Sequence, residues 1–184
     1  GGRPTSLPYH IKNRKLPPRP WRFTDDTNMA LSIYEVLRKF QQIDQDKLAW
    51  SFAEHFDRTR GYGMGARHLL IRVTAGQPWK RVTYEMFGGE GSYGNGSAMR
   101  VAPLGAYFAD DMNALVENAA LSSEVTHAHP EGIAGAIAVA AATAVAWRSR
   151  GTPITRPDLI DRVLPYVPDS EVKKGIETAR EIPS

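Results

Sequence analysis

The segment from Glu131 to Arg150 places the strongest limit on how this chain folds. It is very rich in alanine, with Gly132 and Gly135 near its start. Alanine is the best helix former, and a helix with small, apolar side chains on every side packs closely against all of its neighbours. The segment falls short of the roughly 20 strongly apolar residues that a membrane span requires. We therefore predict the central helix of an all-α domain, and no membrane segment.

Further helices are predicted on both sides of this segment. Apolar residues recur at helical spacing after Thr24, at Met29, Ile33, Val36, Leu37 and Phe40. Capping and breaking residues indicate the other helices. These helices open near Asp44, cover 67–75, cover 99–108 with a bend or a restart at Pro103 and Gly105, and follow Asp110 or Asp111, Thr155 and Asp169. Residues 80–87 allow at most one short strand. The sequence therefore predicts a compact, all-α, multi-helix single domain over residues 24–184.

Residues 1–23 differ from the rest of the chain in charge and composition. Among the 184 residues, 23 Lys and Arg against 20 Asp and Glu give a net charge of +3. The first 23 residues hold six of these basic side chains, no acidic one and five prolines. Because proline disfavours helix, we predict an extended basic arm. Such an arm either attracts phosphates, including those of nucleic acid, or is a solvated surface segment. We favour the surface segment because no nucleic-acid-binding motif is present.

The chain contains no cysteine. This composition excludes disulfides and thiol chemistry, and it favours a reducing compartment. The basic, proline-rich start also lacks the apolar core of a signal peptide. We therefore expect a cytoplasmic protein.

Thr24, Asp25 and Asp26 place a hydroxyl and two carboxylates at the start of the first predicted helix. One interpretation is local, because threonine caps helices well and acidic residues in the first turn suit the positive end of the helix dipole. The other is chemical, because three oxygen ligands on consecutive residues of a rigid helix end suit Mg²⁺ or Mn²⁺. Two further motifs favour the chemical interpretation.

The first motif is a Gly-x-Gly-x-x-Gly pattern at Gly89, Gly91 and Gly94. A dinucleotide-binding fold would need a strand before it, a helix after it and an acidic residue about 20 positions later. The sequence does not show this alternation of strands and helices. The glycines nevertheless allow backbone N–H groups to approach an anion, and Tyr93 is available to stack on a base or cover a sugar. The alternative is a flexible surface loop, which the Asn, Tyr, Met and Arg placed among the glycines disfavour.

The second motif carries His127 and His129 before Pro130, which suits the first position of a helix. No third nitrogen or sulfur ligand lies nearby, which argues against zinc. His127, on the loop that enters the helix, is able to hydrogen-bond a phosphate or ribose, or to serve only in packing and capping. For His129 we prefer the capping interpretation.

Three segments together resemble the ADP-ribosylglycohydrolase family: FTDDTNMAL (23–31), GSYGNGSAMRVAPLG (91–105) and SSEVTHAHPEGIAGA (122–136). The resemblance covers about residues 21–150. It implies an all-helical scaffold, a pair of Mg²⁺ ions, and removal of ADP-ribose from modified protein side chains by cleavage of a C1″–N or C1″–O bond. The sequence of the second segment resembles the branch that includes the serine-ADP-ribose hydrolases more than the nitrogenase-reactivating branch.

The resemblance also implies roles for individual residues. The metal ligands would be Thr24, Asp25 and Asp26, of which the two carboxylates also serve catalysis. The residues that surround the diphosphate and ribose would be Ser92, Tyr93, Gly94, Asn95 and Gly96, with His127 in contact with the ligand. Residues 58–63 resemble a family segment near which some members hold an acidic residue, and Asp57 is the nearest catalytic candidate.

Two motifs of the family do not occur in this sequence, a GDALG-like opening and a late acidic motif of the GGDTDT type. We therefore expect a domain that is incomplete at both ends and weakly active or inactive, whether as a fragment, a natural truncation or half of an assembly. The alternative function is that of an inactive ADP-ribose-binding or structural, crystallin-like relative, against which the intact TDDT argues. Expected partners are ADP-ribose or ADP-ribosylated proteins. The acceptor side chain stays open.

Overall fold

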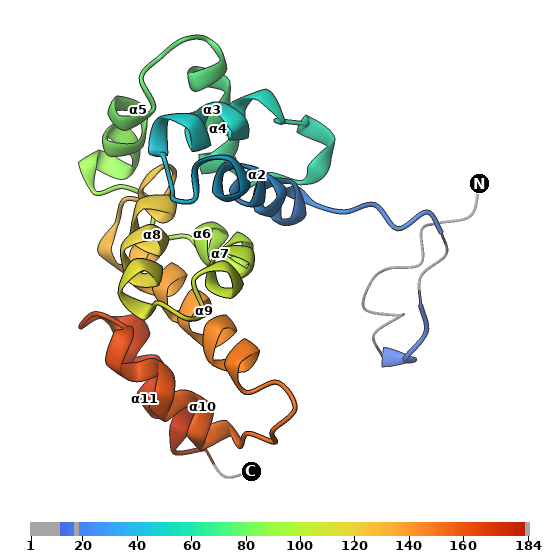
Figure 1. Ribbon diagram of the computed structural model, residues 1–184. Coiled ribbons are helices and arrows are strands. Elements are labelled where there is room, and N and C mark those ends of the chain that lie inside the picture. Colours follow the sequence, from blue (N-terminus) through green and yellow to red (C-terminus); the bar gives the residue numbers. More distant parts are fainter. Residues whose placement is uncertain (1–11, 17–18, 183–184) are drawn as a thin grey trace.

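The alanine-rich segment forms α9 (Pro130–Arg148), the longest helix of the described residues in the computed structural model (Figure 1). The structure describes residues 12–16 and 19–182. By length and composition alone, α9 is the one helix of these residues that would cross a membrane, yet half of its apolar stretch is buried inside the protein. The helices that pack against it are α6 (Gly96–Arg100), α7 (Ala102–Tyr107), α8 (Met112–Glu124), α10 (Arg156–Val163) and α11 (Glu171–Arg180). The prediction of an all-α fold is confirmed.

The small side chains of α9 permit a very close helix contact. A Cβ atom added to Gly105 of α7 would lie 2.3 Å from the carbonyl oxygen of Ala140 in α9. Ala140, Ala141 and Ala144 are fully buried. Because protein interiors are close-packed, no space for such an atom exists between the two helices. α7 and α9 therefore pack backbone against backbone.

Between the described N-terminal residues and the glycine-rich segment lie the α-helices α2 (Asp25–Phe40), α3 (Gln45–Glu54), α4 (Met64–Thr74) and α5 (Trp79–Glu85). They lie together in Figure 1, on the side of α6 and α8 that faces away from α10 and α11. Their apolar faces enter one core cluster, with Ile33, Leu48, Phe52 and Leu70 almost fully buried. α2 also packs against α6 and α7. This contact brings the start of α2 next to the glycine-rich segment.

Side-chain caps confirm several predicted helix starts. Asp44 accepts a hydrogen bond from the amide of Lys47 at 3.0 Å, and Thr155 caps α10. Asp111, one of the two predicted alternatives, accepts from the amides of the first turn of α8 at 3.1 and 3.0 Å. A cap removes unpaired N–H groups from the helix end, which is why these residue types mark starts so well.

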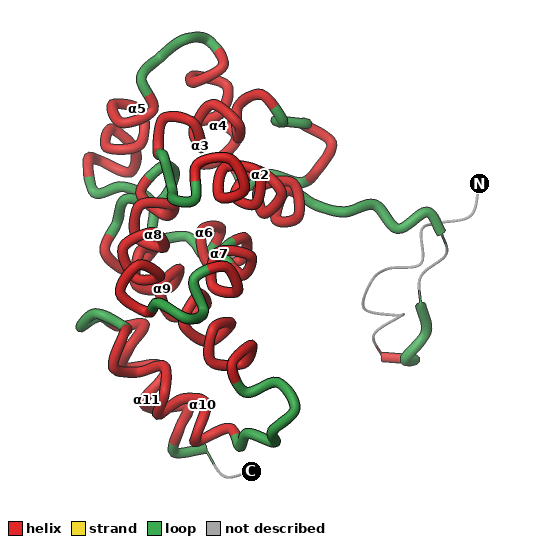
Figure 2. Tube along the Cα trace, viewed as in Figure 1, coloured by secondary structure: helices red, strands yellow, loops and turns green. Residues whose placement is uncertain are grey.

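Three predictions about the elements are wrong. Residues 80–87 do not form a strand, because Trp79, Val82 and Met86 recur at helical spacing and are buried in α5 and the following 3₁₀ helix η2 (Met86–Gly89). The predicted interruption of 99–108 is present, but it lies at Val101, where α6 and α7 meet, and not at Pro103 or Gly105. Ser170 caps α11 through the amide of Lys173, whereas Asp169 pairs with the ammonium group of that lysine at 3.2 Å. Figure 2 traces the described residues as helices and loops without a strand.

The predicted basic arm falls partly on residues 1–11 and 17–18, which lie outside the described residues. Residues 12–16 and 19–23 are exposed, and in Figure 1 the part next to α2 runs away from the helical body. The division into an arm over 1–23 and a helical domain over 24–184 stays a prediction.

Candidate active site

The start of α2 carries the predicted carboxylate pair. Thr24 occupies the N-cap position, but its hydroxyl makes no capping bond to the helix amides and donates to Oδ2 of Asp26 at 3.2 Å. Asp25 and Asp26 are the acidic residues of the first turn, where the helix dipole favours negative charge. The cap position was therefore predicted correctly, while the hydroxyl joins the cluster of oxygen atoms instead of the helix end.

The two carboxylates line a cavity of about 210 Å³, and they influence each other. Partial burial, together with the charge of Asp26, raises the pKa of Asp25. Two carboxylates held this close repel each other when both are ionised. A cation beside them relieves that repulsion.

The loop after α3 is held against α2 close to this pair. Asn28 of α2 donates to the carbonyl oxygen of His55 at 2.6 Å and to the hydroxyl of Tyr62 at 2.9 Å. Gly61 has a φ of +88°, a conformation that favours glycine, and a Cβ atom there would lie 3.9 Å from Oδ1 of Asp25. The loop therefore passes directly beside the carboxylate.

Asp57 has a structural position in this loop. It caps the 3₁₀ helix η1 (Arg58–Arg60) by accepting from the amide and hydroxyl of Thr59 at 2.9 and 2.7 Å, and these bonds lower the pKa of its carboxyl. It also pairs with Arg60 at 3.1 Å. Arg60 lies over the ring of Phe23 at 3.8 Å and donates to the carbonyl of that residue. Asp57 lies outside the cavity lining, and its catalytic role stays a prediction.

The glycine-rich segment forms another part of the cavity wall. Ser92, Gly94, Asn95 and Gly96 line it, and the amide of Gly94 donates to Oγ of Ser92 at 3.2 Å. Tyr93 lies outside the lining, 69% exposed. Its exposed ring is free to cover a ligand. α6 is only five residues long, so an anion at this wall depends on loop amides more than on a helix dipole.

His127 completes this wall. Its Nδ1 lies 2.7 Å from the hydroxyl of Thr126, and its ring packs against the glycine-rich segment. A Cβ atom on Gly96 would lie 2.9 Å from Cε1 of the ring and 3.1 Å from Nε2. Burial, helped by the charge of Arg100, lowers the pKa of His127 to about 3. The imidazole is therefore neutral at physiological pH.

His129 has a separate task from that of His127. Its Nδ1 accepts a hydrogen bond from the amide of Glu131 at 3.1 Å, as the N-cap of α9. Its ring also meets the edge of Tyr93, with centroids 5.4 Å apart. The capping interpretation of His129 is confirmed.

Arg100 is a charged lining residue to which the sequence patterns assigned no role. It is 1% exposed, and its guanidinium group lies 4.6 Å above the ring of Phe52 and donates to the carbonyl of Ser122 at 2.9 Å. Its Nε atom has no hydrogen-bond partner, and no carboxylate of the described residues pairs with it. Burial lowers the pKa of Arg100 to about 9, which leaves it charged at neutral pH. The cavity thus holds a buried positive charge as well as two carboxylates.

The donors present fit a hard cation in part. Thr24, Asp25 and Asp26 offer the oxygen ligands that Mg²⁺ prefers, but an octahedral shell needs further oxygens from water or a ligand. Within residues 12–16 and 19–182, no group of three or more His, Asp or Glu side chains is placed to hold a metal ion. Thr24, Asp25 and Asp26 would therefore supply at most half of a shell for one ion.

Comparison with known proteins assigns this chain to a family. The model of the family described as ADP-ribosylglycohydrolase matches residues 2–183. The chain is 34% identical to "ADP-ribosylhydrolase ARH3" of Xenopus tropicalis over 157 residues, which cover 83% of this chain and 43% of that protein. It is 35% identical to the ARH3 of Homo sapiens over 136 residues, 71% of this chain and 37% of that protein. It is 31% identical to the uncharacterized protein YegU of Escherichia coli over 125 residues, 64% of this chain and 36% of that protein. The chain spans less than half the length of these relatives, yet the family model covers nearly all of it, and it therefore belongs to the ADP-ribosylglycohydrolase family.

Proposed function

We propose that this chain binds ADP-ribose and takes part in its hydrolytic removal from modified protein side chains. The observation that carries the proposal is the shared cavity, which Asp25 and Asp26 line together with the glycine-rich segment and His127. Family membership and the names of the ARH3 relatives support the same reaction.

The two walls have different tasks in this proposal. The backbone amides of residues 92–96 hold the diphosphate, because glycines allow anions to approach the chain closely. Neutral His127 makes one hydrogen bond with a ribose hydroxyl or a phosphate oxygen. Tyr93 covers the ligand from outside. Buried Arg100 adds positive charge beneath the diphosphate.

Thr24, Asp25 and Asp26 would hold Mg²⁺. The ion, when bound, supplies positive charge that fixes and polarises ligand oxygen atoms. Hydrolysis breaks the bond between C1″ of the ribose and the acceptor nitrogen or oxygen, adds the hydroxyl of water to C1″, and returns a proton to the acceptor. A carboxylate beside C1″ accepts the proton of the attacking water. Asp25 and Asp26 are the carboxylates that line the cavity.

The test is a calorimetric titration of this chain with ADP-ribose, in Mg²⁺ and again in EDTA. We expect binding that depends on the metal and is lost in the Asp25→Asn, Asp26→Asn variant. The chain offers a matched control in Asp110 and Asp111, a second acidic pair at a helix start outside the cavity. Asparagine also caps helices, so Asp110→Asn, Asp111→Asn should fold and bind normally. Equal loss of binding in both variants, or no binding to the unaltered chain, would contradict the proposal.

A second candidate function is binding without hydrolysis. It is favoured by the half shell of metal ligands, since no larger group of metal-binding side chains occurs in the described part of the chain. Release of ADP-ribose from an ADP-ribosylated protein, measured beside the titration, separates the two functions. Release that disappears in EDTA and in the Asp25→Asn, Asp26→Asn variant supports the hydrolase, whereas binding without release supports the second candidate.

A further inference from the structure

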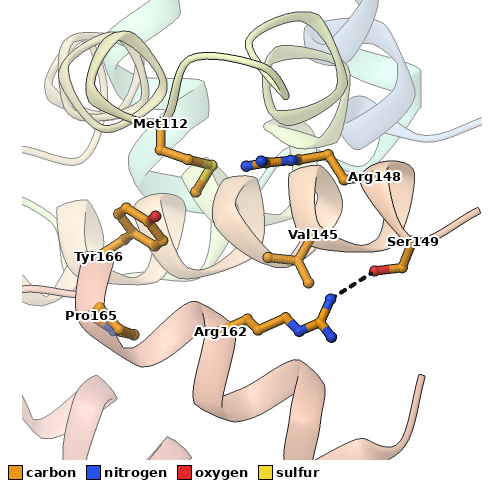
Figure 3. A pocket seen from close by; sticks show the side chains of 7 residues that line it. All are labelled: Met112, Val145, Arg148, Ser149, Arg162, Pro165 and Tyr166. Atoms are coloured by element: carbon orange, nitrogen blue, oxygen red, sulfur yellow. Dashed lines mark hydrogen bonds between the residues drawn. The ribbon is translucent and has the colours of Figure 1, made fainter.

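A second and larger cavity lies near the end of α9. Its volume is about 460 Å³, within the usual range of small-molecule sites (Figure 3). The candidate active site lies at the start of the same helix, where Gly132 packs against Ser92 and His127. A helix of 19 residues is about 28 Å long, so the two cavities are far apart. They share no lining residue.

Two arginines from different helices line this second cavity. Arg148 belongs to the last turn of α9 and Arg162 to the last turn of α10. Figure 3 shows them on opposite sides of Val145, Arg148 extending toward Met112 and Arg162 toward Ser149. A position at a helix end stabilises a cation through the helix dipole. The dipole accounts for each arginine separately, but it does not require that both line one cavity.

The charge of these arginines is not balanced by carboxylates. Within the described residues neither arginine forms an ion pair, and Arg162 makes only a long hydrogen bond of 3.4 Å to Oγ of Ser149. The nearby acids are engaged elsewhere. Asp161 is bound by Arg180, and Asp111 accepts from amides of α8. The cavity is therefore a concave site with two available forks of N–H donors.

The remaining lining residues define the ligand further. Met112, Val145 and Tyr166 add apolar surface, and Ser149 adds a hydroxyl group. A tetrahedral phosphate presents oxygens in several directions, so it accepts hydrogen bonds from two guanidinium forks that approach from different sides. A planar carboxylate is already satisfied by one fork. We propose that this cavity binds a small organic phosphate, with the phosphate between Arg148 and Arg162 and an apolar or aromatic body against Met112, Val145 and Tyr166.

Methionine methyl groups report on the two cavities separately. Met112 lines the second cavity, whereas Met29 and Met99 line the candidate active site, and Met86 lies in the core. The experiment is a titration of the chain, labelled with ¹³C in its methionine methyl groups, with phenyl phosphate. We expect a saturable shift of the Met112 signal with small changes at Met86. Inorganic phosphate and benzoate should bind more weakly, since each lacks one half of the proposed ligand.

The variant Arg148→Gln, Arg162→Gln should weaken the binding of phenyl phosphate by about tenfold or more, because it removes charge-assisted hydrogen bonds. The matched control is Arg38→Gln, Lys39→Gln, which removes two charges from the last turn of α2. An unchanged Met86 signal shows that each variant is folded. A Met112 signal that does not shift or does not saturate, equal binding of benzoate, or equal weakening in both variants would overturn the proposal. Changes confined to Met29 and Met99 would also overturn it, and would locate the ligand in the candidate active site.

Discussion

Replacement of Gly105 by alanine tests the contact between α7 and α9. The added Cβ atom would lie 2.3 Å from the carbonyl oxygen of Ala140 and 2.9 Å from Cβ of Thr143, whereas Cβ atoms essentially never come within 3.0 Å of another heavy atom. The carbonyl belongs to the backbone in the middle of α9, so it cannot rotate away, and the two helices have to separate. Overpacking of this kind costs about 1–3 kcal/mol, and a backbone clash belongs at the upper end.

The same substitution at Gly175 of α11 is the matched control, because no atom lies within 4 Å of its Cβ position. Alanine in place of glycine inside a helix stabilises a protein by about 0.5–1 kcal/mol. The same gain applies to Gly105 and offsets part of the clash. We therefore expect Gly105→Ala to lower the free energy of unfolding by about 2 kcal/mol, and Gly175→Ala to raise it by up to about 1 kcal/mol.

Urea unfolding followed by circular dichroism measures both changes, and each kcal/mol should also shift the melting temperature by about 2–4 °C in a chain of this size. The two variants should therefore shift the melting temperature in opposite directions, and their melting temperatures should differ by several degrees. If Gly105→Ala is as stable as Gly175→Ala, α7 and α9 are not in backbone contact. The reasoning that makes α9 a close-packed central helix would then be refuted.

Three further predictions concern the cavity and the core. Gly96→Ala should weaken ADP-ribose binding with little change in stability, because its Cβ atom would displace the ring of His127; titration calorimetry checks this, and unchanged binding would contradict it. Because the pKa of His127 is about 3 when folded and about 6.5 when unfolded, the unfolded state takes up a proton first on acidification, and stability should fall by up to about 1.4 kcal/mol per pH unit between these values. Urea unfolding of His127→Gln at pH 6.5 and 5 should show a smaller loss than in the unaltered chain, and equal losses would refute the low pKa. Asn118→Ala should lower the free energy of unfolding by about 2 kcal/mol, because it leaves the amide of Ile43, now 2.7 Å from Oδ1, without a partner; a loss below about 0.5 kcal/mol in urea would contradict it.

The helices that were predicted correctly have local sequence features that mark them, either an apolar stripe or a capping residue. α2 has an apolar stripe, and α8 and α10 have caps one residue before their starts. The segment 80–87 was predicted wrongly because its alternating apolar residues also fit a helix. The buried hydroxyl of Thr83 donates to the carbonyl of Val125, a contact between distant parts of the chain that the local sequence does not reveal. Local patterns do not reveal which face a neighbouring helix will cover.

In the candidate site, too, residues in local motifs were predicted, and a residue placed by tertiary packing was not. Asp25, Asp26, Ser92, Gly94, Asn95, Gly96 and His127 were predicted as site residues from three separate segments, and all of them line one cavity. Arg100 was not assigned a role because nothing local marks a buried arginine. Its position depends on Phe52 and Met29, which come from other helices. A cationic side chain without an acidic partner becomes apparent only when the packing around it is known.

Glu131 links the loop of His127 to the far end of the chain. Its two carboxylate oxygens accept the amides of Glu171 and Val172 at 2.8 and 2.9 Å, so the second residue of α9 holds the first turn of α11. Hydrogen exchange at these two amides therefore senses the first turn of α9, which begins directly after the ligand-facing loop. A change in their exchange on ligand binding would report on the cavity from a helix that does not line it, without any label near the ligand.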